Sequence, residues 1–573
     1  MHKGSMNTLD RLKNRAILNA VSAYGGICRR SYLNAAKRTD RVEKKVLSGI
    51  LRRNADTEFG IKNRFRDIRT IEDYQDTVPF SVYSDYADYL DRTAMRGEQN
   101  LITSDRISFL ADTSGTTGIT KHIPVVPRSY APYLGCMAMY FNLLKKELKT
   151  RGLRGGKVLN TIESESSVTP GGIRQGFISA FVVGNSRFLI ENATCLPLEV
   201  LGYGATIDMK YIKARCALAE AELVGAVSAF MSTVTDLMYY ITENHEMLER
   251  DIASGGIDAS INIPPELRAS LRRRFKPDPE RAEAIRRAFS CGTHEGLVPR
   301  LWPGMSLIVA IGTGEFAPFA EKMRYYCGGR VKFCYSMYCA SESLFASAVN
   351  VEDENYLMLA HAGFFEFIPV DDEFDENTMR PLLLHELEVG KHYEVVVTSL
   401  AGLYRYRIND VIVVTGYEGK SPLIRFAYRK NQLINITGIK LTAEHITNAI
   451  AGFEKRIGVK VLDYSLYPDL SRAPWRIQAF MELDGEIPSE MQSSVPSVFD
   501  EELSKVNAEH GHMLKIGESS PSVVCTVARG SYERYRAERA KQKLSGNQVK
   551  AVRYIDTPDK LEYFNSCVEK VYE

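Results

Sequence analysis

A polar loop near residue 115 has the composition of a phosphate-binding site. It reads Thr113-Ser114-Gly115-Thr116-Thr117-Gly118, and Lys121 follows three residues later. The two glycines let the backbone approach a ligand closely, and backbone N–H groups, hydroxyls and one cation are the donors that a polyphosphate needs. The spacing does not match the GxxxxGK[ST] pattern of a Walker A loop. A simple polar turn between two strands would have the same composition, so this loop alone does not define a site.

Two carboxylates stand after apolar, strand-like runs further along the chain. Glu342 belongs to the run Tyr338-Cys339-Ala340-Ser341-Glu342-Ser343, and Asp410 ends the run Leu403-Tyr404-Arg405-Tyr406-Arg407-Ile408-Asn409-Asp410. A carboxylate beside nucleotide phosphates can hold Mg²⁺, and a carboxylate can also accept hydrogen bonds from both hydroxyls of a ribose. Taken singly, Glu342 could equally open a helix, and Asp410 could occupy a turn between strands.

In this order the motifs resemble the signatures of the acyl-adenylate-forming superfamily. The loop is similar to its Ser/Thr-Ser-Gly-Thr-Thr/Ser-Gly pattern before a lysine, and residues 338–342 are similar to its Tyr-x-x-[Ser/Thr]-Glu. For its Tyr-Arg-x-Gly-Asp we prefer the alignment with residues 406–410, although the chain could instead carry an inserted Tyr404-Arg405 pair. Asn409 then stands where the superfamily has glycine, and asparagine tolerates a positive φ better than most residues.

Further stretches narrow the resemblance to the GH3 family of acyl-acid amido synthetases, over nearly the whole chain. They are Glu163-Ser164-Glu165 with Thr169-Pro170-Gly171-Gly172-Ile173, Leu301-Trp302-Pro303, Thr313-Gly314, Phe364-Phe365-Glu366-Phe367-Ile368-Pro369, Arg429-Lys430-Asn431-Gln432, Gly530-Ser531-Tyr532, and Gln548-Val549-Lys550-Ala551-Val552-Arg553. Each stretch is short, but together they are specific to this family.

The resemblance implies roles for particular residues. The residues expected to contact ATP or AMP are Thr113, Ser114, Gly115, Thr116, Thr117, Gly118, Lys121, Ser341, Glu342, Phe364, Asp410 and Arg429. Among these, Glu342 would be the Mg²⁺ ligand, Phe364 would replace a tyrosine that stacks on adenine, and Asp410 would anchor the ribose. Lys550 would enter the active site during adenylation, where a cation can stabilise the charge that develops on the carboxylate and the α-phosphate.

Substrate contacts are expected in both halves of the chain. By resemblance they are Thr169, Gly171, Gly172, Ser531 and Tyr532. By analogy, the acyl pocket is expected between residues 128 and 140, at the loop around Gly171, and near residues 227–231.

The reaction implied by the resemblance has two steps. ATP and a carboxylic acid would give an acyl-adenylate and pyrophosphate, and the amine of an amino acid or another amine would then displace AMP. The acyl-adenylate is already activated, so the enzyme need only position the amine and exclude water. We therefore assign no nucleophilic Cys or Ser. The alternatives are an acyl-CoA ligase of the same superfamily and, in another class, a nucleotide-binding protein without catalysis.

The elements that must position these residues suggest an α/β fold in two domains. A chain of 573 residues exceeds the size of a single core. Strands are expected in the apolar runs KVLNTI, FISAFVV, MSLIVAI, VKFCYSMY, FFEFIPV and YEVVVTS, and helices at 41–53, 443–453 and, last in the chain, 532–544. We expect a large N-terminal acyl- and ATP-binding domain, residues 1–428, and a smaller mobile α+β domain, residues 429–573.

Composition excludes several other functions. Lys and Arg number 73 against 71 Asp and Glu, without a one-sided block, so no nucleic-acid partner is expected. No apolar run approaches membrane-spanning length, and the N-terminus lacks the apolar segment of a secretory signal. Ten scattered cysteines without a CxxC pair indicate reduced thiols, a cytoplasmic protein and no structural zinc. The expected partners are a small acid and an amine, and the oligomeric state stays open.

Overall fold

The computed structural model divides the chain into two compact units. Unit 1 is Met1–Phe426 and unit 2 is Ala427–Glu573, and each is described by itself. The boundary falls two residues before the predicted one. The structure describes residues 8–113, 121–148, 156–162, 166–203, 207–370, 375, 379–430, 434–436, 439–441, 443–471, 474–515, 519–542 and 552–573. No helix among these residues is long and apolar enough to cross a bilayer.

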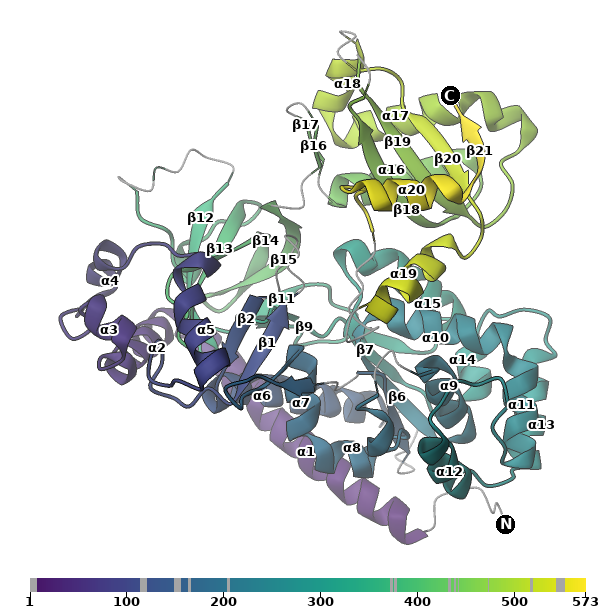
Figure 1. The fold of residues 1–573 in the computed structure, drawn as a ribbon, viewed down its shortest axis with the longest axis horizontal. Helices are drawn as coiled ribbons and strands as arrows, with labels where there is room; N and C mark the ends of the chain where they lie inside the picture. The colour runs from purple at the N-terminus through teal and green to yellow at the C-terminus, as the bar shows by residue number, and fades with distance from the viewer. Residues whose placement is uncertain are drawn as a thin grey trace. The chain divides into compact units, whose positions relative to one another are not determined.

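A four-stranded parallel sheet forms the centre of unit 1. Its order is β3-β6-β7-β8, and its strands are β3 (Lys157–Asn160), β6 (Leu223–Phe230), β7 (Leu307–Ile311) and β8 (Lys332–Cys334). Helices cover both faces, with α6 (Pro127–Leu148) on one side and α10 (Met231–Glu243) and α14 (Leu297–Leu301) on the other (Figure 1). A sheet covered on both faces requires strands that are apolar throughout, which explains runs such as MSLIVAI.

Two further sheets complete unit 1. One has the order β2-β1-β5-β4 and the other has the order β12-β13-β14-β15-β11-β10-β9. Their strands are β1 (Phe109–Thr113), β2 (Lys121–Val125), β4 (Ser166–Val168), β5 (Arg174–Gly176), β9 (Met337–Cys339), β10 (Leu344–Ser347), β11 (Tyr356–Met358), β12 (Gly363–Pro369), β13 (His392–Ser399), β14 (Tyr406–Glu418) and β15 (Ser421–Arg429). Strands β1 and β2 pair in antiparallel fashion, so the polar loop joins two strands.

The remaining helices of unit 1 surround these sheets. They are α1 (Thr8–Ala36), α2 (Thr39–Asn54), α3 (Glu58–Lys62), α4 (Ile71–Thr77), α5 (Ala87–Arg96), α7 (Ile178–Asn185), α8 (Arg187–Ala193), α9 (Met209–Ala219), α11 (His245–Ser254), α12 (Pro265–Arg274), α13 (Pro279–Phe289) and α15 (Ala317–Cys327). The helix predicted at 41–53 is confirmed by α2. Helix α1 packs closely along α6. At Gly25 the two backbones are so near that a Cβ there would lie 1.9 Å from the carbonyl oxygen of Ala138.

One strand prediction in unit 1 is wrong. The run FISAFVV, residues 177–183, forms helix α7 rather than a strand. Apolar residues occupy all sides of this short helix, so its sequence has neither the period of a strand nor that of an amphipathic helix. Packing of Phe181 against Phe109 and Tyr130 accounts for the apolar character of the helix.

Unit 2 is an α+β unit with a four-stranded sheet in the order β18-β19-β20-β21. Its strands are β16 (Ile434–Ile436), β17 (Ile439–Leu441), β18 (Val461–Asp469), β19 (Arg476–Leu483), β20 (Val523–Val527) and β21 (Val568–Tyr572), and its helices are α16 (Ala443–Ile457), α17 (Val495–Val506), α18 (Ala508–Lys515), α19 (Ser531–Gln542) and α20 (Pro558–Ser566). Helices α16 and α19 confirm two predicted helices. Helix α19 is not the last one, however: α20 follows it and begins at Pro558, a residue type that favours the first position of a helix.

The stability of the protein depends on pH through one buried carboxyl group in unit 1. The Glu43 side chain on α2 is 0% exposed, and its Oε1 accepts a hydrogen bond of 3.2 Å from the Leu384 N–H. His385 Nδ1 lies 3.5 Å from Oε2. Burial raises the pKa of Glu43 from the ordinary 4.5 to about 8. The fold therefore holds this proton more tightly than the unfolded chain does.

We expect Glu43→Gln to raise the stability of the protein at alkaline pH. The stability due to the Glu43 proton is complete below about pH 4.5 and is lost as the pH rises through about 8. The variant should therefore be more stable than the natural protein at pH 9, by about 4 kcal/mol, and nearly equal to it at pH 5, since each unit of pKa difference corresponds to about 1.4 kcal/mol. Thermal melting at both pH values measures this, and a stability gain of the same size at pH 5 would contradict a charge effect.

Candidate active site

A tight hairpin carries the second predicted motif. Strands β9 and β10 pair in antiparallel fashion, and the Ala340 N–H donates to the Ser343 carbonyl at 2.9 Å. Ser341 and Glu342 occupy the turn and are half-buried. The Tyr133 hydroxyl of α6 donates to the Ala340 carbonyl at 3.2 Å, which ties the turn to the helix. Glu342 therefore lies between two strands and does not open a helix.

The structure brings the second and third motifs into contact. The Tyr338 hydroxyl donates to Asp410 Oδ2 at 2.9 Å, although the two residues are 72 positions apart. Asp410 is 2% exposed and lies in β14. The residue before it, Asn409, has a φ of 63°, so this position does require the left-handed backbone that glycine or asparagine adopts most readily. A buried carboxylate that follows a left-handed residue within β14 is thus held beside the Glu342 hairpin.

The two arginines of this segment hold the surrounding strands. Arg405 Nε lies 3.1 Å from Glu366 Oε2, and both side chains are buried. Arg407 makes a two-point contact with Glu394, at 2.8 and 2.7 Å. Such bidentate pairs fix the relative position of the strands that carry them. The YRYR sequence is therefore part of the framework around Asp410.

The polar loop is described only at its two ends. Thr113 ends β1, and it pairs with Lys121 at the start of β2, whose Nζ lies 5.5 Å from the centre of the Tyr83 ring. Next to this pair, His122 Nδ1 lies 3.0 Å from Asp112 Oδ1. The predicted phosphate contacts Ser114, Gly115, Thr116, Thr117 and Gly118 lie outside the described residues, as does Lys550. Arg429 is the last residue of β15.

A glycine loop that the sequence analysis did not place in the site follows strand β7. Ligands of open parallel sheets bind beyond the carboxyl ends of the strands, and residues 312–314, Gly-Thr-Gly, stand at that position. Thr313 Oγ1 and the Tyr356 hydroxyl are 3.0 Å apart, and the Tyr356 hydroxyl lies 3.0 Å from the Tyr335 carbonyl after β8. Two glycines directly after the buried run MSLIVAI were the signal that could have identified this loop.

The structure argues against the predicted role of Phe364. Its side chain is 0% exposed in β12, and its ring makes an edge contact with Tyr74, with centroids 5.9 Å apart. A ring enclosed on all sides has no free face for adenine. Phe364 replaces a family tyrosine at a position that belongs to the core of this protein.

Ser531 and Tyr532 are also interior residues. Both are buried in unit 2, where the Tyr532 hydroxyl donates to the Phe480 carbonyl at 2.9 Å. The Ser531 carbonyl accepts a hydrogen bond of 2.7 Å from Tyr563. These contacts place Ser531 and Tyr532 in the core of unit 2.

The glycines of the predicted substrate loop, between β4 and β5, have a structural role. A Cβ on Gly171 would lie 2.4 Å from the Gly97 nitrogen, so the loop packs backbone to backbone against the end of α5. The Thr169 hydroxyl accepts from the Ile173 N–H at 3.1 Å, and Gly172 has a φ of 81°. Thr169 is buried, Gly171 is half-buried and Gly172 is exposed.

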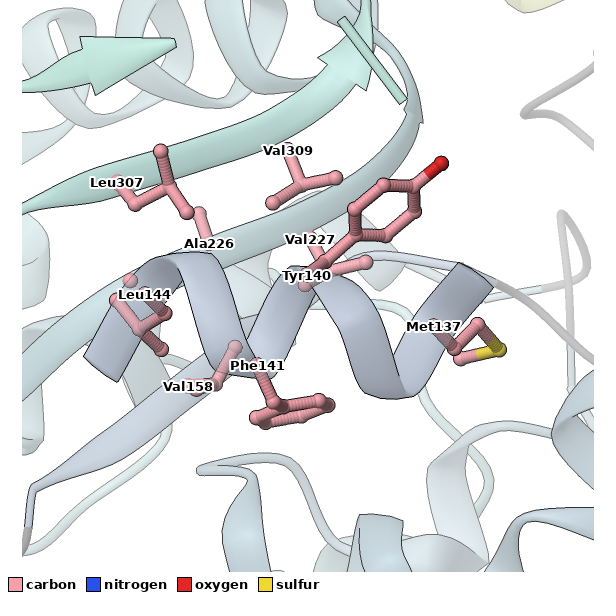
Figure 2. A pocket seen from close by; sticks show the side chains of 10 residues that line it. Met137, Tyr140, Phe141, Leu144, Val158, Ala226, Val227, Leu307 and Val309 are labelled. Atoms are coloured by element: carbon pink, nitrogen blue, oxygen red, sulfur yellow. The ribbon is translucent and has the colours of Figure 1, made fainter. Parts of the chain in front are cut away.

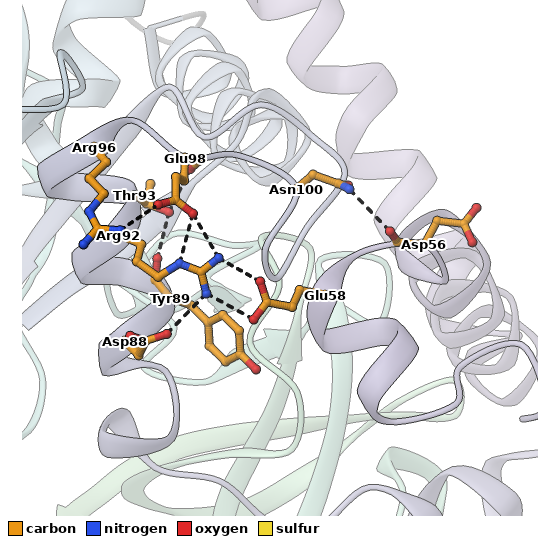
Figure 3. A network of polar contacts seen from close by, with 9 residues as sticks. All are labelled: Asp56, Glu58, Asp88, Tyr89, Arg92, Thr93, Arg96, Glu98 and Asn100. Carbon is orange, nitrogen blue, oxygen red and sulfur yellow. Dashed lines mark hydrogen bonds and ion pairs between the residues drawn. The ribbon is translucent and has the colours of Figure 1, made fainter.

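An ion-pair network fixes the position of α5, the helix against whose end this loop packs. Arg92 on α5 contacts Glu58 at 2.8 Å, Asp88 at 3.3 Å and Glu98 at 2.9 Å (Figure 3). Glu58 opens α3, and Glu98 directly follows Gly97. One guanidinium thus joins α3, α5 and the chain after α5, the segment against which Gly171 packs.

An apolar cavity of about 30 Å³ lies between α6 and the parallel sheet (Figure 2). It is lined by Met137, Tyr140, Phe141, Leu144, Val158, Gly225, Ala226, Val227, Leu307 and Val309. Met137, Tyr140 and Val227 fall in segments predicted for the acyl pocket, whereas the residues of β3 and β7 were not predicted. The Tyr140 hydroxyl lies 2.9 Å from Ser347 Oγ on β10, so the wall of the cavity is joined to the Glu342 hairpin.

The cysteines do not suggest covalent catalysis. All ten are free, and burial raises the pKa of the Cys339 thiol, beside the hairpin turn, to about 12. A thiol with such a pKa is almost entirely protonated at neutral pH and is a poor nucleophile. Across the part of the chain that the structure describes, no three His, Cys, Asp or Glu side chains gather as a metal site.

Solved structures and curated proteins with a similar chain carry the names of amido synthetases. The structure of AtGH3.15 acyl acid amido synthetase in complex with 2,4-DB has a TM-score of 0.84 at 23% identity, covering 96% of this chain and 97% of that one. The jasmonoyl-L-amino acid synthetase GH3.5 of Oryza sativa subsp. japonica is 28% identical, over 86% of this chain and 88% of its own. The indole-3-acetic acid-amido synthetase GH3.3 of Arabidopsis thaliana is 27% identical, over 93% and 92%. The fold is therefore that of an amido synthetase, and the class of protein is a ligase.

Three family models match the chain in succession. They describe the GH3 family N-terminal domain at residues 28–332, the central domain at residues 356–429 and the C-terminal domain at residues 444–559. The first alone spans more than half of the 573 residues. This chain belongs to the GH3 family.

Proposed function

We propose that this GH3 protein uses ATP to convert a carboxylic acid into an acyl-adenylate and then transfers the acyl group to an amine. The observation that carries the proposal is the contact of Tyr338 with buried Asp410, next to the half-buried Glu342. Two separate motifs of an adenylating site are in contact there, in the described part of unit 1. The names of the relatives support an amide as the product, with an amino acid as the amine.

Each of these groups has a role in the adenylation step. Asp410 accepts hydrogen bonds from the ribose hydroxyls, and Tyr338 keeps its carboxylate oriented. The loop from Thr113 to Gly118, with Lys121, binds the phosphates through N–H groups, hydroxyls and one positive charge. Arg429 and Ser341 complete the nucleotide contacts. Lys550 balances the charge on the reacting carboxylate and α-phosphate while pyrophosphate leaves.

Mg²⁺ fits this donor set. It prefers oxygen ligands and is commonly held by one or two carboxylates together with substrate phosphates. Glu342 would hold it, because this carboxylate stands on a turn that α6 fixes through Tyr133. When bound, the ion would neutralise phosphate charge.

The second step depends mainly on the position of the amine, because the acyl group is already activated. The acyl-adenylate carries a stabilised phosphate as its leaving group, so an amine held close to the acyl carbon can attack it without a covalent enzyme intermediate. The half-buried setting of the hairpin limits the access of water. We propose that residues 1–428 bind the acid and ATP, that residues 429–573 are mobile, and that the ten free thiols reflect a cytoplasmic location.

We further propose that the apolar cavity is the inner end of the acyl pocket, and we expect Val227→Leu to discriminate between acids by length. The added methylene would occupy much of the 30 Å³ cavity. The kcat/KM for the longest accepted acid should fall by about tenfold or more, while short acids stay unaffected, because one methylene group in an apolar pocket is worth about 1–3 kcal/mol. The rate of pyrophosphate exchange over a series of acids measures this.

Val298→Leu is the matched control. Val298 lines a second apolar cavity, of about 20 Å³, on the opposite face of the sheet. The same substitution there should leave the preference for acid length unchanged. Equal effects of the two variants on all acids would show general strain on the sheet and would contradict a substrate role for the first cavity.

The proposed function is tested by carboxylate-dependent ATP–pyrophosphate exchange over a panel of aromatic and aliphatic acids. Mass spectrometry of the products with pooled amino acids, and separately with coenzyme A, then identifies the acceptor. Exchange together with an amide product supports the proposal. A thioester product would assign the chain to acyl-CoA ligases, and ATP binding without exchange for any acid would reduce it to a nucleotide-binding protein.

A further inference from the structure

Helix α1 of unit 1 exposes large apolar side chains along one side. Leu12 is 57% exposed, Ile27 is 62% exposed, and Tyr24, at the edge of this side, is 52% exposed. An α-helix has 3.6 residues per turn, so Leu12 and Ile27 point in similar directions, about 22 Å apart along the axis. Between them on this side, which we call the α1 stripe, lie three exposed alanines: Ala16, Ala20 and Ala23. Single exposed apolar residues are common, but a continuous stripe indicates an interaction surface.

The opposite side of α1 is fixed to helix α6. The Asn142 side chain donates to the Ser22 carbonyl at 3.0 Å, and the Tyr32 hydroxyl donates to the Pro132 carbonyl at 3.4 Å. Together with the close backbone approach at Gly25, these contacts hold the helix along the outside of unit 1 (Figure 1). The α1 stripe therefore faces away from the core, on a helix that is already formed before a partner binds.

The sequence of α1 and of the turn after it is strongly basic. Between Asp10 and Asp40 there is no acidic residue, and there are seven basic ones: Arg11, Lys13, Arg15, Arg29, Arg30, Lys37 and Arg38. Lys13, Arg15 and Arg30 are exposed on the helix beside the α1 stripe. The balance of the whole chain, 73 Lys and Arg to 71 Asp and Glu, does not reveal this local excess. The stripe is thus bordered by positive charge.

This combination fits the surface of a membrane with anionic lipids. Apolar side chains can enter the boundary between headgroups and acyl chains, while lysine and arginine keep their charges among the headgroups. A tyrosine ring with its hydroxyl is typical of this boundary, which agrees with the place of Tyr24. A second copy of this chain would bring two positive faces together, and a nucleic acid would leave the apolar side chains in water. A protein partner would have to offer an acidic groove that matches this helix, whereas a bilayer offers both properties along its whole length.

We propose that the exposed side of α1 binds the surface of a membrane that contains anionic lipids. The helix lies in the plane of the membrane, because its other side stays packed on α6. Binding requires no ordering of the chain, since the helix is folded beforehand. This inference is independent of the proposed catalysis and adds a second binding surface to unit 1.

The first test is co-sedimentation of the full chain with vesicles. The probes are vesicles of phosphatidylcholine alone and vesicles in which a third of the lipid is phosphatidylserine. We expect binding only to the anionic vesicles at about 0.1 M salt and its loss at about 1 M salt, because the Debye length falls from about 10 to about 3 Å. Equal binding to both kinds of vesicle, or binding to neither, contradicts the proposal.

Removing the exposed charges should weaken binding without affecting the fold. In the triple variant Lys13→Gln, Arg15→Gln, Arg30→Gln we expect the affinity for the anionic vesicles to fall by about 100-fold, because each cation near an anionic surface strengthens binding by about fivefold. The melting temperature should stay unchanged, since all three side chains are exposed.

The matched control removes three exposed charges from α12 in the triple variant Arg272→Gln, Arg273→Gln, Arg274→Gln. Both leucines of α12 are buried, so this helix has no counterpart of the α1 stripe. Its affinity for the anionic vesicles should fall by about twofold at most, through the smaller net charge. Equal losses in the two triple variants would show attraction by net charge alone and would overturn the proposal.

The apolar part of the surface is tested at Ile27. We expect Ile27→Ser to lower the affinity for the anionic vesicles by about tenfold, because the membrane no longer covers a large apolar side chain. Ile61→Ser on α3 is the matched control, since Ile61 is 67% exposed, and it should bind like the natural protein. Natural affinity in Ile27→Ser would exclude insertion of the stripe.

Tyr24→Trp reports the contact itself. The two natural tryptophans, Trp302 and Trp475, are 2% and 8% exposed, so a new exposed indole dominates any change in emission. We expect a blue shift when anionic vesicles are added, and an unshifted emission from vesicle-bound protein would place the contact elsewhere. Sedimentation without lipid is the last measurement: a dimer that Ile27→Ser dissociates would assign the α1 stripe to a second copy of the chain and overturn the proposal.

Discussion

Asp410→Asn is expected to lower the kcat/KM for ATP in pyrophosphate exchange by about 100-fold or more. The neutral amide keeps the shape of the side chain but cannot accept two charge-assisted hydrogen bonds from the ribose. Each such bond contributes about 1.5–3 kcal/mol, and every 1.4 kcal/mol corresponds to a factor of ten. The melting temperature should change little, because the amide oxygen can still accept the Tyr338 hydroxyl bond of 2.9 Å.

Two neighbouring substitutions serve as controls for this result. Tyr338→Phe leaves the carboxylate in place and removes one donor, so its loss should be tenfold at most. Asn409→Gly should be nearly neutral, since the φ of 63° at this position suits glycine. An Asp410→Asn variant with the natural KM and kcat would show that the ribose is bound elsewhere.

Lys550→Ala is expected to reduce exchange by about 1,000-fold while leaving the second half-reaction intact. A preorganised charge that meets the developing negative charge in a site from which water is excluded is worth about 3–4 kcal/mol to the transition state. This charge is needed only while the acid attacks the α-phosphate. Amide formation from a prepared acyl-adenylate should therefore proceed at the natural rate, and rapid-quench measurements of each half-reaction provide the comparison.

Lys541→Ala is the matched control, a lysine nine positions earlier in the same part of the chain. It should retain full exchange, because the proposal gives it no role at the phosphates. If both lysine variants lost exchange equally, the effect would be one of net charge on unit 2. If both half-reactions failed in Lys550→Ala, the lysine would act in binding and not in adenylation.

Elements with a strong local pattern were predicted well from the sequence. Helices α2 and α16 have apolar residues at the period that only a helix produces. The run 177–183 was predicted wrongly, because its apolar residues have no period and its neighbours decide the outcome. Helix α20 was missed even though Pro558 stands at its first position.

The order of the motifs indicated an adenylating enzyme, and the geometry shows which of their members can meet. Residues 338 and 410 are 72 positions apart, and they touch although β15, β11 and β10 lie between β14 and β9 in the order of the sheet. The Gly-Thr-Gly loop is a candidate ligand-binding loop only because it lies at the carboxyl end of β7. No local pattern reports that place, because it depends on the order of the strands.

Residue types and their order, through the resemblance to the GH3 family, were enough to predict the chemistry of this protein from a polar glycine-rich loop, two carboxylates and a late lysine. The fold alone decided which candidates are buried and which side chains they contact. Phe364, Ser531 and Tyr532 proved to be interior residues, and Gly171 serves a backbone contact with Gly97. The reason is that burial and pairing depend on residues far apart in the chain, whereas the character of a side chain is present in the sequence itself.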